Sequence, residues 1–301
     1  MRKISKVAAI DCGTNSIRLL ISEDGREIIR EMEIVKLGEG VDRTKNFSPI
    51  AVERTLVALR RFKALIDHHK VERVRFCATS ATRDAQNRKI FTEPVESILG
   101  VAPEVIVGIE EARLSFLGAT SELPISDAPF LVVDIGGGST EFVLGERSVQ
   151  SAISVDIGCV RMTERHFTND PPTEQEIAST RLDINRAIDQ VETEVPISSA
   201  RTLVAVAGTA TTVAAAALKL PTYDREAIHG ARISAERTFE ISNWLLSMDK
   251  NERANLGFMH PGRVEVIAAG ALVLAEILKR TGAREFVASE RDILDGIVAT
   301  F

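Results

Sequence analysis

Residues 130–145 read FLVVDIGGGSTEFVLG, and residues 7–22 read VAAIDCGTNSIRLLIS. In each segment an apolar run ends in an aspartate, Asp134 or Asp11, and a glycine-containing turn leads into a second apolar run. A serine follows each aspartate five residues later. Short apolar runs bounded by turn residues predict β-strands, so each segment predicts a β-hairpin. Because the same pattern occurs twice, the sequence predicts an internally duplicated chain.

The composition indicates a water-soluble protein with two domains. The chain has 301 residues, and a single core rarely grows beyond about 250 to 300 residues. Hydrophobic residues make up 45% and charged residues 27% of the sequence, which is ordinary for a globular protein. The net charge of −6 argues against nucleic acid as a partner, because nucleic-acid binders usually carry a basic surface.

No segment indicates secretion or a membrane partner. The apolar run after the N-terminal basic residues is too short for a signal peptide, and the longest uncharged stretch, residues 202–218, contains a glycine and four threonines. Cys12, Cys77 and Cys159 lie far apart and form no CxxC pair, so neither a disulfide framework nor a zinc site is expected. These features predict a cytoplasmic protein with reduced thiols.

Strands alternate with helices along the chain, which predicts layered α/β domains. Beyond the two hairpins, strands are expected at residues 71–78, 105–107, 152–155, 202–207 and 285–288. Helices are expected at residues 49–66, 87–99, 110–121, 173–191, 212–218, 263–280 and 291–299. The stretch 122–129 contains two prolines and is the best linker, so we place the domains at 1–125 and 126–301. Packing of the last helix on the first domain is left open.

The two hairpin turns have the chemistry of a phosphate site beside a metal site. Backbone N–H groups released by glycine bind phosphate oxygens, and a carboxylate at a strand end suits a hard divalent cation. For one turn alone the alternative is an ordinary hairpin, and the duplication argues against it. The candidate phosphate-binding residues of the two turns are Gly13, Thr14, Asn15, Ser16, Gly136, Gly137, Gly138 and Ser139.

A third turn, VAGTATTVAAA at residues 206–216, follows an expected strand and precedes an expected helix. The N–H groups of Gly208 and Thr209 suit an anion at the helix N-terminus. Small residues also allow a strand and a helix to pack closely, and this alternative stays open for the turn taken alone.

The three turns together resemble the phosphate and nucleoside loops of the actin, sugar-kinase and heat-shock chaperone superfamily. Six segments narrow the resemblance to the exopolyphosphatase and guanosine pentaphosphatase family, in the same order and spacing: ATSATRDAQN, VGIEEARLSFLGA, VDIGGGSTE, GCVRMTERHF, AGTATT and RVEVIAAG. This resemblance covers nearly the whole chain. It implies two ribonuclease-H-like (actin-like) α/β domains with the active site in a cleft between them.

The resemblance also implies roles for residues outside the turns. Glu111 matches the family's catalytic glutamate, and we assign it as general base, because phosphoanhydride hydrolysis needs a positioned and partly deprotonated water. Without the resemblance, Glu111 fits better as a first-turn acid favoured by the helix dipole. Arg83 and Asn87 match a polar pair in the family and are expected to bind phosphate. Arg18 is a weaker candidate of the same kind.

Magnesium is the expected cofactor. Asp134 is the leading metal-linked carboxylate, Asp11 is its counterpart in the first hairpin, and Glu141 is a further candidate in the GGGSTE segment. Oxygen ligands suit Mg²⁺ better than Zn²⁺, and the five histidines are scattered without ligand spacing. We expect the histidines to have structural roles.

The expected activity is removal of the terminal phosphate from inorganic polyphosphate, with pppGpp 5′-phosphatase activity as the close alternative. An actin-like kinase or filament protein is a remote alternative, and a homodimer is left open. Two features depart from the family. The helical domain of larger members is not found here, and the segment SERDILDG carries Asp292 and Leu294 where the family usually has glycine and arginine. An arginine-dependent contact there is therefore not assumed.

Overall fold

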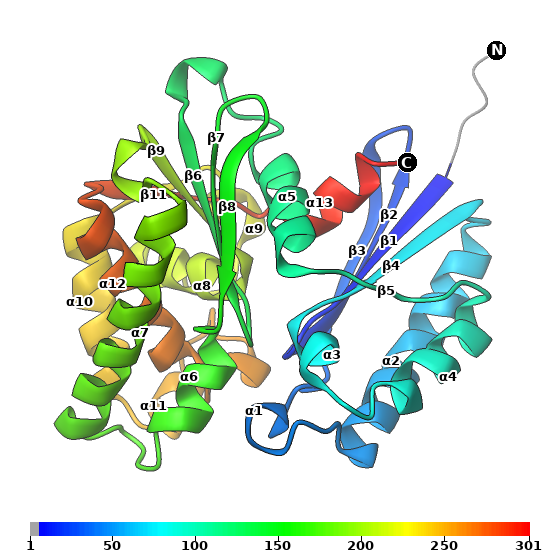
Figure 1. Ribbon diagram of the computed structural model, residues 1–301, viewed down its shortest axis with the longest axis horizontal. Coiled ribbons are helices and arrows are strands. Elements are labelled where there is room, and N and C mark those ends of the chain that lie inside the picture. Colours follow the sequence, from blue (N-terminus) through cyan, green and yellow to red (C-terminus); the bar gives the residue numbers. More distant parts are fainter. Residues whose placement is uncertain (1–5) are drawn as a thin grey trace. The chain divides into compact units, whose positions relative to one another are not determined.

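The computed structural model describes residues 6–301 (Figure 1). The chain divides into two compact units, one formed by Met1–Gly118 with Ile293–Phe301 and the other by Ala119–Asp292. This division falls a few residues before the boundary expected from the sequence, and the last helix lies within the first unit. Of the helices formed by residues 6–301, none has both the length and the apolar character to cross a membrane.

The first unit is built on a five-stranded sheet with the order β3-β2-β1-β4-β5. The strands are β1 Lys6–Cys12, β2 Ser16–Glu23, β3 Arg26–Ile34, β4 Arg73–Ala78 and β5 Glu104–Val105. The first three strands form an antiparallel meander, and β4 and β5 run parallel to β1. The strand β1 is buried along nearly its whole length, as expected for a central strand covered on both faces.

Helices cover both faces of the first sheet. They are α1 Val41–Thr44, α2 Pro49–His68, α3 Ser80–Asp84, α4 Lys89–Leu99, α5 Gly108–Ala119 and α13 Ile293–Val298. Proline at the first position starts α2, and its apolar side chains at helical spacing, including Leu59 and Phe62, pack on the sheet with Ile10. On the other face, Ile297 of α13 packs against Ala9. Full burial of each such large apolar side chain contributes about 1.5–3 kcal/mol.

The second unit repeats this topology in a six-stranded sheet with the order β10-β11-β9-β6-β7-β8. The strands are β6 Phe130–Ile135, β7 Thr140–Gly145, β8 Val149–Val155, β9 Thr202–Val206, β10 Arg232–Ser234 and β11 Glu285–Ala288. Again three antiparallel strands come first, and two later strands, β9 and β11, extend the sheet in parallel to the first strand. A meander followed by parallel strands on the side of its first strand is the ribonuclease-H-like, actin-like arrangement. The predicted duplication and fold class are therefore confirmed.

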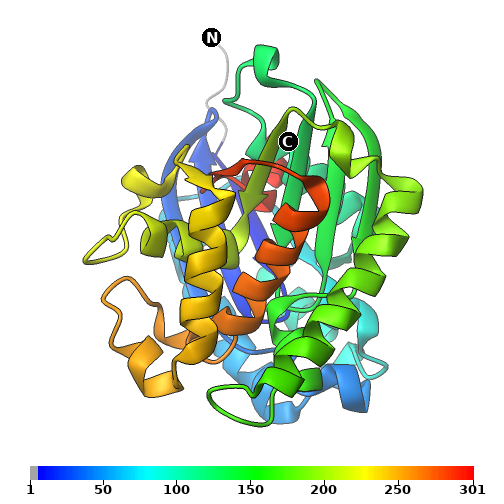
Figure 2. The same ribbon diagram turned by 90° about the vertical axis from the view of Figure 1, so that its left-hand side faces the viewer.

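The helices of the second unit are α6 Cys159–His166, α7 Glu174–Glu194, α8 Ala207–Ala217, α9 Arg225–Ile228, α10 Ala235–Ser247, α11 Lys250–Ala254 and α12 Ile267–Thr281. Figure 2 shows α7, α12 and α10 side by side over one face of the sheet. The middle helix, α12, is buried from Ile267 to Leu278. A helix that is apolar on every side belongs in a core, which explains its place between two amphipathic neighbours.

Several elements were not predicted from the sequence. The strand β3 has no clear sequence signal, because charged residues are spread through REIIREMEI at the sheet edge. The short helices α3 and α6 and the longer α10 were also missed. The helix after the third turn begins at Ala207 and not at residue 212, so the turn residues form its first turn.

Candidate active site

The two hairpin turns have the same backbone geometry. In the first unit the Gly13 N–H donates to Ser16 O at 3.0 Å, and in the second the Gly136 N–H donates to Ser139 O at 3.0 Å. Both bonds close the turn between the first and second strands of a meander. The sequence repeat is thus also a repeat of local structure.

The helix α6 orients the peptide groups of the second turn. The Val160 N–H donates to Gly137 O at 2.9 Å, and Arg161 Nε donates to Gly138 O at 2.6 Å. Because these carbonyls point toward α6, the N–H groups of the turn point away from it. No acceptor within residues 6–301 takes the N–H of Gly137 or Gly138. Converging N–H groups of this kind form an anion-binding site.

Glycine is required where α6 meets this turn. A Cβ atom on Gly158 would lie 2.3 Å from the carbonyl carbon and oxygen of Gly137, and 2.5 Å from Gly138 N. Any other residue would push the turn and the helix apart. The signature segment and the later GCVRMTERHF segment are therefore parts of one structure.

Hydrogen bonds from other segments of the first unit hold the first turn. Thr14 Oγ1 lies 2.9 Å from Ser80 Oγ, and Thr14 O accepts a hydrogen bond from the Gly38 N–H at 2.9 Å. Asn15 O accepts from the N–H groups of Val35 and Lys36. These bonds use the carbonyl groups of the turn. Within residues 6–301 no acceptor takes the Thr14 N–H, which corresponds in the repeat to that of Gly137.

The residue that faces the aspartate across the strand pair differs between the two hairpins. In the first hairpin Asp11 pairs in register with Arg18, and Arg18 Nε and Nη2 donate to Asp11 Oδ2 at 3.0 and 2.7 Å. In the second hairpin Asp134 pairs in register with Glu141. Directly opposed residues in an antiparallel pair lie on the same face of the sheet. One hairpin therefore holds an ion pair where the other holds two carboxylates.

Hydroxyl groups hold the Glu141 carboxylate. Ser139 Oγ and Ser154 Oγ each donate to Glu141 Oε1 at 2.7 Å, and Ser154 lies opposite Glu141 on β8. Asp134 and Glu141 are both buried, with 6% and 1% of their surface exposed. A row of oxygen-bearing side chains thus crosses three adjacent strands at the turn. This donor set has the character that a hard cation requires.

Glu111 lies in the first turn of α5 and is bound by Arg83. Arg83 Nη1 donates to Glu111 Oε2 at 2.6 Å and to Ile106 O at 3.0 Å. The Glu111 side chain is 11% exposed, and a carboxylate this buried needs such a partner. Among the contacts of residues 6–301, Nη1 is the atom of the Arg83 guanidinium that is engaged. Its other N–H groups remain available to an anion.

Asn87 has a different environment from the one expected. Its Oδ1 accepts from the Phe47 N–H at 2.8 Å, and its Nδ2 donates to Phe47 O at 3.0 Å. The side chain thus ties two loops of the first unit together. Its phosphate-binding role stays a prediction, and the contact gives it a structural one.

The third turn is a strained strand-to-helix junction. Ala207 has a φ of 66°, a conformation that residues with a Cβ rarely adopt. The next residue, Gly208, lies against the Arg263 guanidinium, and a Cβ there would be 2.4 Å from Arg263 Cζ. Since Val206 pairs in register with Asp134, the third turn begins beside the second one. The Thr209 side chain packs toward Gly270.

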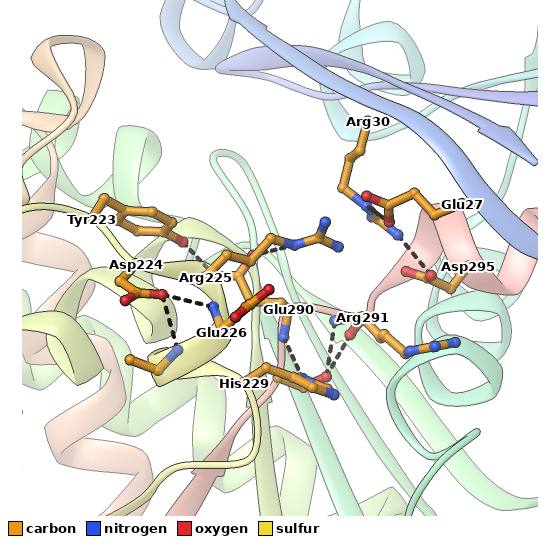
Figure 3. A network of polar contacts seen from close by, with 12 residues as sticks. Glu27, Arg30, Tyr223, Asp224, Arg225, Glu226, His229, Glu290, Arg291 and Asp295 are labelled. Atoms are coloured by element: carbon orange, nitrogen blue, oxygen red, sulfur yellow. Dashed lines mark hydrogen bonds and ion pairs between the residues drawn. The ribbon is translucent and has the colours of Figure 1, made fainter.

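A polar network beside the third turn was not predicted (Figure 3). Tyr223 Oη donates to Glu290 Oε1 at 2.5 Å, and Arg225 Nε lies 3.4 Å from Glu290 Oε2. Burial raises the pKa of Tyr223 to about 12 and also raises the pKa of Glu290. The positive charge of the nearby Arg263 opposes both shifts without cancelling them. Glu290 belongs to the segment that departs from the family pattern, which was the one sequence signal for this network.

The three cysteines are buried thiols. Burial raises the pKa of Cys159 to about 11 and that of Cys77 to about 12, and it raises the pKa of Cys12 well above its ordinary value. All three are therefore neutral thiols at physiological pH. Within residues 6–301 no group of three or more His, Cys, Asp and Glu side chains is close enough to hold a metal by itself.

Comparisons with known proteins identify the family of the chain. Residues 22–300 match the Ppx/GppA phosphatase family. Exopolyphosphatase 2 of Mycobacterium tuberculosis is 47% identical over 311 aligned positions, covering 98% of each chain. A crystal structure of an exopolyphosphatase-like protein superposes with a TM-score of 0.95 at 46% identity and 98% coverage of both chains. Guanosine-5′-triphosphate,3′-diphosphate pyrophosphatase of Photobacterium profundum is 38% identical over 165 positions, which cover 53% of this chain and 33% of that protein. The chain therefore belongs to the Ppx/GppA phosphatase family.

Proposed function

We propose that this protein is an exopolyphosphatase, which hydrolyses the terminal phosphoanhydride bond of inorganic polyphosphate and releases orthophosphate. The observation that carries the proposal is the pair of equivalent turns, each with an aspartate at the strand end and with N–H groups that no acceptor within residues 6–301 takes. Such turns bind phosphate oxygens without regard to what else the substrate carries. The high identity to an exopolyphosphatase over the full chain supports the same substrate class.

Glu111 is the proposed general base. It accepts a proton from the attacking water while the water oxygen bonds to the terminal phosphorus and the bridging P–O bond breaks. The bond from Arg83 fixes the orientation of the Glu111 carboxylate. The remaining N–H groups of Arg83 are proposed to bind an oxygen of the terminal phosphoryl group, which would place phosphorus and base together.

Magnesium is the proposed cofactor, held in the second unit by Asp134 and Glu141. The observed donors fit this ion, because Mg²⁺ usually takes one or two protein carboxylates and completes its shell with water and substrate phosphates. A bound Mg²⁺ would offset phosphate charge. Asp11 is already paired with Arg18, so we propose that it orients the first turn and acts on the metal at most through water.

Hydrolysis of the 5′ phosphate of pppGpp is the second candidate function. The Tyr223 and Glu290 network beside the third turn favours it, because a phenol and a carboxylate are suited to the hydroxyl and N–H groups of a nucleoside. An ionised carboxylate in that position cannot donate a hydrogen bond to a phosphate chain and would repel its oxygens. The two candidates share the proposed base and metal.

A phosphate-release assay tests the proposal. Purified protein is incubated with long polyphosphate, short polyphosphate, pppGpp or ATP, each with Mg²⁺ and with chelator. We expect Mg²⁺-dependent release from polyphosphate and a loss of about 10² to 10⁴-fold in kcat for Glu111→Gln. Release from pppGpp alone would establish the second candidate. Absence of release from both substrates with a folded protein would refute the proposal.

A further inference from the structure

The second unit contains a pocket at the opposite end of its sheet from the glycine turns. Its volume is about 520 Å³, within the range of small-molecule sites. Leu131 and Leu203, which are register partners near the beginnings of β6 and β9, contribute to its floor. Asp134 lies three residues farther along β6, which is about 10 Å at the rise of a strand. The pocket is therefore separate from the proposed catalytic residues of this unit.

Arginine side chains line the pocket. Arg201 precedes β9, Arg284 precedes β11, and Arg232 begins β10, so three elements bring guanidinium groups to one place. Among the lining residues Glu285 is the acidic one. The lining thus carries a net positive charge in a chain whose net charge is −6.

Two of these guanidinium groups lack a carboxylate partner among residues 6–301. Arg201 Nη1 donates to the neutral Ser126 carbonyl at 2.7 Å. Arg284 is exposed and makes no side-chain hydrogen bond or ion pair with a described residue. Arg232 differs, because it binds Glu285 at 2.7 Å and Asp127 at 3.4 Å. The charges of Arg201 and Arg284 are therefore uncompensated at the pocket.

The C-terminal end of α12 also borders the pocket, and its carbonyl groups would oppose an anion. Two features reduce that effect. Thr281 Oγ1 donates to Ile277 O at 2.9 Å, and the Gly282 N–H donates to Leu278 O at 3.1 Å, so the last turn is capped internally. The arginines are consequently not needed to satisfy these carbonyls.

We propose that this pocket binds a phosphorylated small molecule, with its phosphate groups on Arg201 and Arg284. Guanidinium groups form charge-assisted, bidentate hydrogen bonds to phosphate. Leu131 and Leu203 are at most 4% exposed, so the contacts to the molecule come from the arginines and not from the apolar floor. A diphosphate group carries enough oxygens to engage both guanidinium groups.

Hydrogen–deuterium exchange of the full-length protein tests this site, with ADP as the probe and chelator present to prevent turnover. Millimolar ADP is expected to slow exchange in peptides covering 197–203 and 281–287. Peptides covering 134–141 and 207–212 report separately on binding at the glycine turns. Adenosine should give no protection, and pyrophosphate should protect these peptides as ADP does.

The double variant R201A/R284A should weaken protection of 197–203 and 281–287 by about tenfold or more in ADP concentration, because two charge-assisted contacts are lost. Both side chains are exposed, so its thermal midpoint should match the wild type. The variant R60A/R237A removes the same charge from exposed ion pairs elsewhere and should behave as wild type. No protection in wild type, or equal protection in R201A/R284A, would overturn the proposal. Equal protection by adenosine and ADP would also overturn it, because adenosine carries no phosphate.

Discussion

Replacement of Glu111 by glutamine tests whether the Glu111 carboxylate accepts the proton of the attacking water. Glutamine keeps the size of the side chain and one oxygen, and it removes the ability to accept a proton. Loss of a general base lowers kcat by about 10² to 10⁴-fold, which corresponds to about 3 to 5.5 kcal/mol of transition-state stabilisation. The variant should keep its KM, because Glu111 is not proposed to bind the phosphate chain.

Replacement of Arg83 by alanine tests how the base is held. The Arg83 and Glu111 side chains are 21% and 11% exposed, so removing one partner leaves a largely buried carboxylate. We expect a stability loss of about 1–3 kcal/mol, between the values for exposed and fully buried pairs. Misplacement of the base by about 1 Å should lower kcat by about 10²-fold. KM should also rise, because Arg83 is proposed to bind the terminal phosphoryl group.

The double variant R83A/E111Q separates these effects. If Arg83 acts on the attacking water through Glu111, kcat of the double variant should lie within about threefold of kcat for Glu111→Gln, because coupled effects are not additive. Arg83→Lys is the matched control, since an ammonium group keeps the charge but lacks the planar fork that binds both Glu111 and Ile106 O. The readouts are initial rates of phosphate release, together with thermal and urea unfolding.

Two results would refute this reasoning. Turnover of a folded Glu111→Gln protein within about threefold of wild type would show that another group takes the proton. Losses that multiply in R83A/E111Q would show that Arg83 acts independently of Glu111.

Three further predictions concern other parts of the chain. Gly158→Ala should cost about 1–3 kcal/mol of stability and most of the activity, because its Cβ would lie 2.3 Å from the backbone of Gly137; native-like melting and turnover would contradict the close approach. The pKa of Glu276 lies below its ordinary value, because hydrogen bonds and charges from groups such as Lys279 outweigh the opposing effect of burial. Glu276→Gln should therefore be less stable than wild type near pH 7, and in urea unfolding this difference should shrink as pH falls below about 4.3, the pKa of the unfolded side chain. Cys159, with a pKa raised to about 11, is about 10⁻³ ionised at pH 8, so iodoacetamide should label it only after unfolding; rapid labelling of the folded protein would contradict its burial.

Local patterns made much of this fold predictable from the sequence. The strands β1, β2, β6 and β7 are short apolar runs that stop at glycine turns, and α2 has Pro49 at its first position and apolar residues at helical spacing. The duplication was visible because Asp11 and Asp134 end equivalent strands. These features depend on residues close together in sequence, which is the information that periodicity reports.

Contacts between distant segments could not be predicted in the same way. Gly158 is required because it touches Gly137, and its own neighbours in the sequence give no sign of that contact. The Tyr223–Glu290 bond joins residues far apart in the chain, and no pattern linked them. Asn87 was expected at a phosphate because a family pattern includes it, whereas its amide is matched to the Phe47 backbone.

The two hairpins carry opposite charges at one equivalent position. Arg18 and Glu141 occupy equivalent places, seven residues after the hairpin aspartates and opposite them on the next strand. In the first hairpin the arginine compensates the aspartate, so this turn presents backbone N–H groups with little net charge behind them. In the second, two carboxylates share a face of the sheet. Under the proposed assignment both turns bind phosphate, and the exchange of arginine for glutamate at this one position gives the second turn the oxygen donors proposed for Mg²⁺. Exchange of Glu141 for arginine should therefore abolish the Mg²⁺ dependence together with activity, whereas Glu141→Gln should shift the Mg²⁺ titration to higher concentration and retain part of the rate. An unchanged Mg²⁺ titration in Glu141→Gln would place the metal elsewhere.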